Sequence, residues 1–216
     1  MSTRILSSAR RPSRRPLFLV ALVTFVALLG CGGGALIPQP PSAPPACTAN
    51  CPPPLRTDQG GHLVQTNHFD VWYFDPYSLD SSDSTSATMV ADDNYGTITV
   101  QFFSNTVPNG LTARQLLDSF EQQNLDPNKF AGLQNTGAIR GAEIGYVPGA
   151  GDTFAATVDD PSAPNTPVFI EIMAATQGTT GIVFAAISPL DPQAPDPSQQ
   201  TDAQGYDQMI NSLLWR

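Results

Sequence analysis

Positive charge is scarce over most of this 216-residue chain. The sequence has ten basic residues, and five of them are arginines within the first fifteen positions. From Cys31 onward, 5 basic residues stand against 19 acidic residues, a net charge of −14. Nucleic-acid binding depends on cationic side chains that displace counterions from phosphates, so we exclude nucleic acid as a partner. Anionic lipid headgroups would be repelled for the same reason, and attachment to a membrane would therefore require a covalent anchor.

Sequence motifs for catalysis are also missing. The sequence contains no G-x-S-x-G nucleophile motif, and its two histidines, His62 and His68, lie too early in the chain to be obvious partners for a serine nucleophile. Gly32–Gly34 lies beside a proline-rich stretch, and Gly149–Gly151 is followed by neither a helix nor a lysine, so neither resembles a phosphate-binding loop. We predict no catalytic residue, no metal site, no cofactor and no enzymatic activity.

The first thirty residues have the pattern of an export signal. Arg10, Arg11, Arg14 and Arg15 precede an uncharged apolar run over residues 17–29. At about 1.5 Å per residue, a helix of this length is shorter than a hydrocarbon core of roughly 30 Å. The run therefore fits the apolar region of a signal peptide better than a membrane span.

The apolar run ends in residues 28–31 (LLGC), which resemble the lipobox of bacterial lipoproteins. The resemblance implies that residues 1–30 are a signal peptide and that Cys31 carries a lipid, such as palmitate, which anchors the protein on the extracytoplasmic face of a membrane in the cell envelope. The sequence departs from the family pattern at Leu29, where a small residue is usual. Residues 13–19 also look like a loose twin-arginine signal, so the export route stays open. An ordinary secretory signal and an uncleaved membrane anchor are the alternatives.

Residues 31–61 have the composition of a tether. Three glycines follow Cys31, and residues 38–54 contain eight prolines. Glycine loosens a chain and proline extends it, so this segment would hold a domain away from a membrane surface. Cys47 and Cys51 are the other two cysteines, and in an oxidising compartment we expect them to form a disulfide. A metal site would need more ligands, and a redox pair would need a two-residue spacing.

From His62 onward, alternating apolar and polar residues predict β-strands. Residues 69–74 and 97–102 alternate cleanly, which places every second side chain on a core face. Further strands are expected near residues 138–147, 153–159, 167–176 and 180–187. Turn residues separate them at 148–152, 160–165 and 177–178. Because these gaps are short, the strands should pair antiparallel.

Two amphipathic helices are predicted in the same region. The first begins at Thr112, where Gln115 completes a capping box and Leu111 and Leu116 form a hydrophobic staple. Its apolar face also contains residues 117 and 120. The second helix runs from about 201 to 214 and is predicted from an apolar stripe at helical spacing. The stripe consists of Tyr206, Met209, Ile210, Leu213 and Leu214.

The predicted order of elements is strands, helix, four strands, helix. It indicates an α+β domain over residues 62–216, with an antiparallel sheet of about six or seven strands covered by two helices. This order resembles the PsbP-like, or Mog-type, α/β fold. The resemblance is carried by residues 69–76, 111–122, 141–146, the pair 168–173 and 181–187, and the closing segment 206–215. It implies a domain that is generally non-enzymatic and binds or assists proteins. No binding residue can be transferred, because the family has no specific motif.

Acidic and aromatic clusters offer further candidate sites. Asp80, Asp83, Asp92 and Asp93, with Asn94, lie in or beside the Ser/Asp/Thr-rich segment 78–88 and could supply oxygen ligands to calcium. Their spacing is irregular, which favours a solvated loop. Asp152, Asp159 and Asp160 are interpreted as turn residues, and a carboxylate pair for glycoside hydrolysis stays open.

The aromatic residues Trp72, Tyr73, Phe74 and Tyr77 could form a binding platform. In a strand at most half of them can be exposed, and core packing is the favoured interpretation. The leading hypothesis is a lipid-anchored, extracytoplasmic, non-catalytic domain that binds a protein or an envelope component. A small extracytoplasmic hydrolase and a small-molecule-binding lipoprotein are the alternatives.

Overall fold

The computed structural model describes residues 61–93, 95–160, 163–190 and 201–216. The expected signal peptide, the candidate lipid-attachment residue Cys31, the tether and the Cys47–Cys51 pair lie outside these residues. In the described part of the chain, no helix has both the length and the apolar character needed to cross a membrane.

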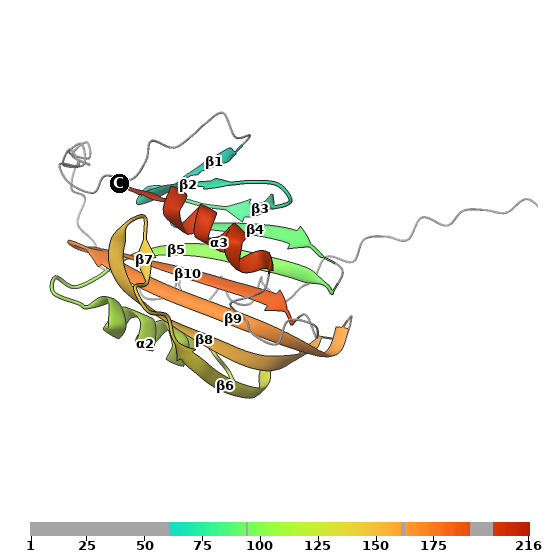
Figure 1. The fold of residues 1–216 in the computed structure, drawn as a ribbon. Helices are drawn as coiled ribbons and strands as arrows, with labels where there is room; N and C mark the ends of the chain where they lie inside the picture. Colours follow the sequence, from blue (N-terminus) through green and yellow to red (C-terminus); the bar gives the residue numbers. More distant parts are fainter. Residues whose placement is uncertain (1–60, 94, 161–162, 191–200) are drawn as a thin grey trace, which may run out of the picture. The chain divides into compact units, whose positions relative to one another are not determined.

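The described chain forms eleven strands and two helices, and all of them except β11 are labelled in Figure 1. The first group is β1 (His62–Gln65), β2 (Phe69–Tyr73), β3 (Ser78–Ser82), β4 (Ser86–Asp92), β5 (Thr97–Thr106) and α2 (Ala113–Asn124). The second group is β6 (Phe130–Ala138), β7 (Glu143–Ile144), β8 (Val147–Asp160), β9 (Ala163–Gln177), β10 (Thr180–Pro189), α3 (Thr201–Ser212) and β11 (Leu214–Trp215).

Two antiparallel sheets organise these strands. The large sheet has eight strands in the order β3-β4-β5-β10-β9-β8-β6, and β7 pairs with β8 beside this path. The small sheet has the order β1-β2-β11. Every pair in both sheets is antiparallel. The α+β class, with two helices on an antiparallel sheet, is therefore confirmed.

The large sheet buries a separate apolar cluster on each face. Helix α2 contacts β8, β9 and β10 on one face, and α3 contacts β2, β7 and β10 on the other. Along β9, alternate residues belong to different clusters, as expected of a strand that is covered on both sides. The small sheet lies on the same face as α3, and its inward residues Val64, Phe69 and Val71 join that cluster.

The structure contains more strands than the six or seven expected. Segment 78–88, which we interpreted as a solvated loop, forms β3 and the start of β4. The strand expected at 138–147 is wrong, because β6 ends at Ala138 and only the short β7 lies in that range. The turn expected at 148–152 is also wrong, because these residues lie inside β8.

Both helices are found where the sequence predicts them. Thr112 is the N-cap of α2 and forms the capping box with Gln115. Helix α3 begins at Thr201 as expected but ends at Ser212. Leu214 is therefore not part of a helical stripe: it lies in β11 and is 44% exposed. The other four residues of the predicted stripe are buried.

Candidate functional site

An apolar patch lies on the outward face of the small sheet. Residues Phe69 and Val71 of β2 are fully buried, so the alternate residues of that strand point away from the core. Leu63 of β1 pairs directly with Trp72 of β2, and Leu214 of β11 pairs with Asp70. The outer patch is defined as Leu63, Trp72, Phe74 and Leu214.

The outer patch is open to solvent on both sides of β2. Leu63 is 45% exposed and Leu214 is 44% exposed, while Trp72 and Phe74 are partly buried. The ring of Phe74 lies over Gly61, where an added Cβ would come within 2.6 Å of the ring. Contiguous exposed apolar side chains of this kind mark interaction sites on soluble domains.

The alternation of β2 divides the four aromatic residues that we considered as a platform. Trp72 and Phe74 belong to the outer patch. Tyr77 is buried, and Tyr73 packs against the core and stacks on His62 with ring centroids 5.1 Å apart. Half of the aromatic group therefore faces outward, which is the most that strand geometry allows, and the other half packs against the core.

The C-terminal segment holds the outer patch in place. Ser212 Oγ accepts a hydrogen bond from the backbone N–H of Trp72 at 3.0 Å and lies 2.7 Å from the Met209 carbonyl oxygen. The Trp215 indole N–H donates to the Ile144 carbonyl oxygen at 2.9 Å. The chain beside β2 is thus fixed from α3 through to Trp215.

A tight turn between β7 and β8 makes this anchoring possible. Gly145 has a positive φ of 57°, and a Cβ there would collide with the Leu213 carbonyl oxygen. Its N–H donates to the Ile210 carbonyl oxygen at 3.0 Å. Only glycine allows this approach, which brings the hairpin against the end of α3.

One ion pair borders the outer patch. Arg216 donates to Asp70 Oδ2 at 2.8 Å, and its backbone N–H donates to the His68 carbonyl oxygen at 2.9 Å. The Oδ1 atom of Asp70 is buried and has no hydrogen-bond partner among the described residues. Apolar side chains and one ion pair therefore share this face of the small sheet.

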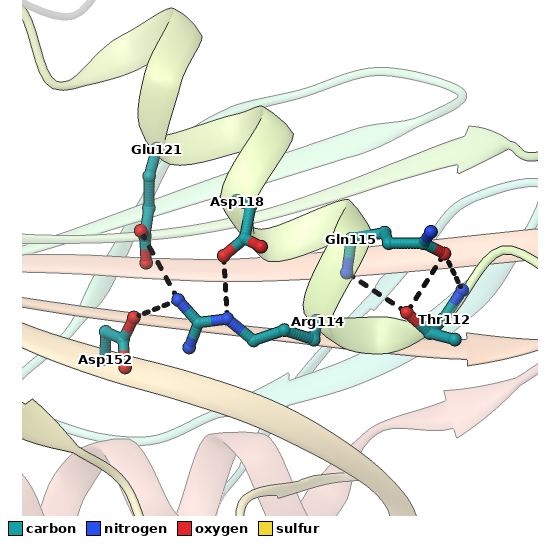
Figure 2. Close-up of polar contacts among 6 residues, drawn as sticks. All are labelled: Thr112, Arg114, Gln115, Asp118, Glu121 and Asp152. Carbon is teal, nitrogen blue, oxygen red and sulfur yellow. Dashed lines mark hydrogen bonds and ion pairs between the residues drawn. The ribbon is translucent and has the colours of Figure 1, made fainter.

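A second polar group lies on the opposite face of the large sheet, between α2 and β8. Figure 2 shows Arg114 reaching from α2 toward three carboxylates. Its guanidinium lies 2.7 Å from Asp118, 2.6 Å from Asp152 and 4.0 Å from Glu121. We define these four residues as the Arg114 cluster.

Burial sets the charge state of the Arg114 cluster. The Asp152 side chain is only 4% exposed, and its hydrogen bond with Arg114 raises the pKa of that guanidinium. Glu121 is 15% exposed at its side chain. Desolvation and the neighbouring charge of Asp152 raise the pKa of Glu121 to about 7. Glu121 can therefore bind or release a proton near neutral pH.

A third acidic group lies near α3. Glu171 points from β9 toward that helix, since its neighbours Ile170 and Ile172 belong to the cluster on the α2 face. Desolvation, together with the charge of Asp207 on α3, raises the pKa of Glu171 to about 7. Desolvation also raises the pKa of Asp207.

Of the residues considered as calcium ligands, Asp80 lies in β3, Asp92 lies in β4, and Asn94 lies outside the described residues. The other two, Asp83 and Asp93, have structural roles in turns. Asp83 Oδ1 accepts hydrogen bonds from the backbone N–H groups of Thr85 and Ser86, between β3 and β4. Asp93 Oδ1 does the same for Tyr95 and Gly96. Within the described ranges, no group of three or more histidine, cysteine or acidic residues is arranged to hold a metal ion.

The three aspartates that we interpreted as turn residues differ in where they lie along β8. Asp159 and Asp160 are the last two residues of β8, where Asp160 pairs with Ala163 of β9. Asp152 lies inside β8 and belongs to the Arg114 cluster, so its interpretation as a turn residue is wrong. Sequence reasoning missed this cluster, although Arg114 and Asp118 have the spacing of a helical ion pair.

Comparisons with known proteins give only structural neighbours. No family model and no curated protein matches this sequence. The Ran-binding protein Mog1p of Saccharomyces cerevisiae is similar at 8% identity over 72% of this chain and 95% of that one, with a TM-score of 0.48. LpqN, involved in cell envelope biogenesis of Mycobacterium tuberculosis, is similar at 13% identity over 72% and 84%, with a TM-score of 0.44.

The neighbours also include a PsbP protein. The solution structure of cyanobacterial PsbP from Synechocystis is similar at 11% identity over 74% of this chain and 89% of that one, with a TM-score of 0.41. Mog1 and PsbP, the two groups that the element order resembles, are thus both among the neighbours. At these identities the matches transfer no function to this chain.

Proposed function

We propose that this protein is an extracytoplasmic lipoprotein whose α+β domain binds a protein or another envelope component through the outer patch, without catalysing a reaction. The observation that carries the proposal is the exposure of Leu63 on β1 and Leu214 on β11, the two strands that flank β2, on the outward face of the small sheet. A partner that covered this face would remove apolar surface from water, and burial of apolar surface contributes a favourable free energy of about 25 cal/mol per Å².

The rigidity of the surrounding structure supports a binding role. The outer patch stands on two strands and on a C-terminal segment that Ser212 and Trp215 hold by hydrogen bonds. Side chains on such fixed elements lose little further conformational freedom when a partner binds. The rim pair of Asp70 and Arg216 would orient the partner more than strengthen its binding.

The export part of the proposal rests on the sequence pattern that ends at Cys31. A Cys31→Ala variant should lose incorporation of radiolabelled palmitate, because the thiol that accepts the lipid is absent. A Cys47→Ala variant is the matched control and should still incorporate the label. Label that persists in the Cys31→Ala variant would contradict the lipid assignment.

The binding part is tested by making the outer patch polar. A Leu63→Gln, Leu214→Gln double variant should lose the chemical crosslinks that the domain forms with envelope components, while its lipid anchor keeps it in the envelope fraction. Leu79→Gln on β3 is the matched control, because Leu79 is 41% exposed and lies outside the outer patch. If both variants crosslink as strongly as the unaltered protein, the outer patch is not the binding surface.

A further inference from the structure

The Arg114 cluster places three carboxylates around one guanidinium, at the junction of a helix and a sheet. Two of these carboxylates come from α2 and the third, Asp152, comes from β8. The Oε1 atom of Glu121 is buried and has no hydrogen-bond partner among the described residues. When all four groups are charged, the cluster carries two uncompensated negative charges, and the side chains of Glu121 and Asp152 are only 15% and 4% exposed.

We propose that the Arg114 cluster is a pH-responsive latch, in which a proton taken up by Glu121 tightens α2 on the sheet and loss of that proton loosens α2. The proton would reduce the repulsion between Glu121 and Asp152 and leave Arg114 to pair with Asp152. A neutral Glu121 and an Asp152 paired with Arg114 could then both stay buried between α2 and β8.

The strands that pack against α2 determine which charged groups surround Glu121. Within the described residues, β9 and β10 present apolar side chains to α2. These are Val168, Ile170, Ile172, Ala174, Val183 and Ala185. Strand β10 contains no charged residue, and Glu171 of β9 points to the other face. The charged groups that face Glu121 are therefore Arg114 and Asp118 of α2 and Asp152 of β8.

The sign of the effect follows from linkage. The pKa of Glu121 is about 7 in the folded protein and 4.5 as an ordinary glutamate. The folded state therefore favours the protonated form of Glu121. The contribution of protonated Glu121 to stability is fully present below pH 4.5. The contribution declines as the pH rises from 4.5 to 7, and above pH 7 it is lost. Helix α2 should be held most firmly in mildly acidic solution.

Amide hydrogen exchange of the full-length chain tests the latch, because it measures the protection of the α2 amides separately from that of other elements. After correction for intrinsic exchange rates, protection of the α2 amides should fall by about five- to tenfold between pH 5.5 and pH 8. In a Glu121→Gln variant, protection of the same amides should be nearly independent of pH. Glutamine has nearly the size of glutamate but does not titrate, so the variant should fold at both pH values.

A Glu171→Gln variant is the matched control, because Glu171 has a similar pKa but lies on the other face. It should leave the pH dependence of the α2 amides unchanged. The proposal is overturned if α2 protection does not vary with pH in the unaltered protein. It is equally overturned if the variation survives in Glu121→Gln or disappears in Glu171→Gln.

Discussion

The two faces of the large sheet accommodate buried acidic groups in different ways. On the α2 face, Asp152 is nearly inaccessible but lies 2.6 Å from Arg114. On the α3 face, burial first and then the like charge of Asp207 raise the pKa of Glu171. A buried acid can therefore be kept ionised by a nearby cation or kept protonated by raising its pKa. In this domain Asp152 lies beside a cation, whereas Glu171 has a raised pKa.

The largest expected effect comes from the apolar packing on the α3 face. Phe184 of β10 is fully buried, and its ring centroid lies 5.3 Å from that of Phe102 and 5.9 Å from that of Tyr206. Phe184→Ala should lower the free energy of unfolding by about 3–5 kcal/mol, because it leaves a cavity between the sheet and α3. Urea unfolding measures this change, and a loss below about 1 kcal/mol would show that α3 does not depend on this contact.

A smaller loss is expected when the cation is removed from the α2 face. Arg114→Met should destabilise the domain by about 2 kcal/mol at pH 7, because Asp152 stays buried without its ion pair. The loss should shrink at pH 5, where Glu121 is protonated and repels Asp152 less. Arg140→Met is the control, because Arg140 is exposed. Thermal unfolding at both pH values measures the difference, and equal losses for the two variants would refute a special role for Arg114.

The opposite sign is expected for Glu171 on the α3 face, because burial and the like charge of Asp207 disfavour its ionised form. Glu171→Gln should stabilise the domain by about 1–2 kcal/mol at pH 8 and have almost no effect at pH 4.5. The raised pKa means that the ionised form is disfavoured in the folded protein, so stability is lost as the pH rises through about 7. Urea unfolding over this pH range, with Glu143→Gln as the exposed control, measures the gain. A destabilised Glu171→Gln variant would contradict the account.

Contacts between residues close in the sequence could be predicted from it, whereas contacts between distant residues could not. The start of α2 was predicted correctly, because the capping box and the staple around Thr112 involve residues only three to five positions apart. The pair of Arg114 and Asp152 is separated by 38 positions. It depends on the register of β8, and no local pattern in the sequence encodes that register.

Glycines explain the incorrect turn at 148–152. Gly149 and Gly151 lie inside β8, where an added Cβ at Gly151 would come within 2.8 Å of Ile139 and Met173. Glycine is present because neighbouring atoms leave no room for a side chain, whereas sequence reasoning assigned it to a turn. Strand β3 was missed for a different reason: all five of its residues are exposed, so it has no apolar alternation to detect.

The most direct test of the binding surface uses a photoreactive residue at one position at a time in intact cells. Placed at position 214, in the outer patch, it should crosslink to a discrete partner that fractionates with the envelope. Placed at position 79, which is similarly exposed on β3, it should give no such product. Equal crosslinking from both positions, or crosslinking from position 79 alone, would contradict the assignment of the outer patch as the surface through which this domain acts.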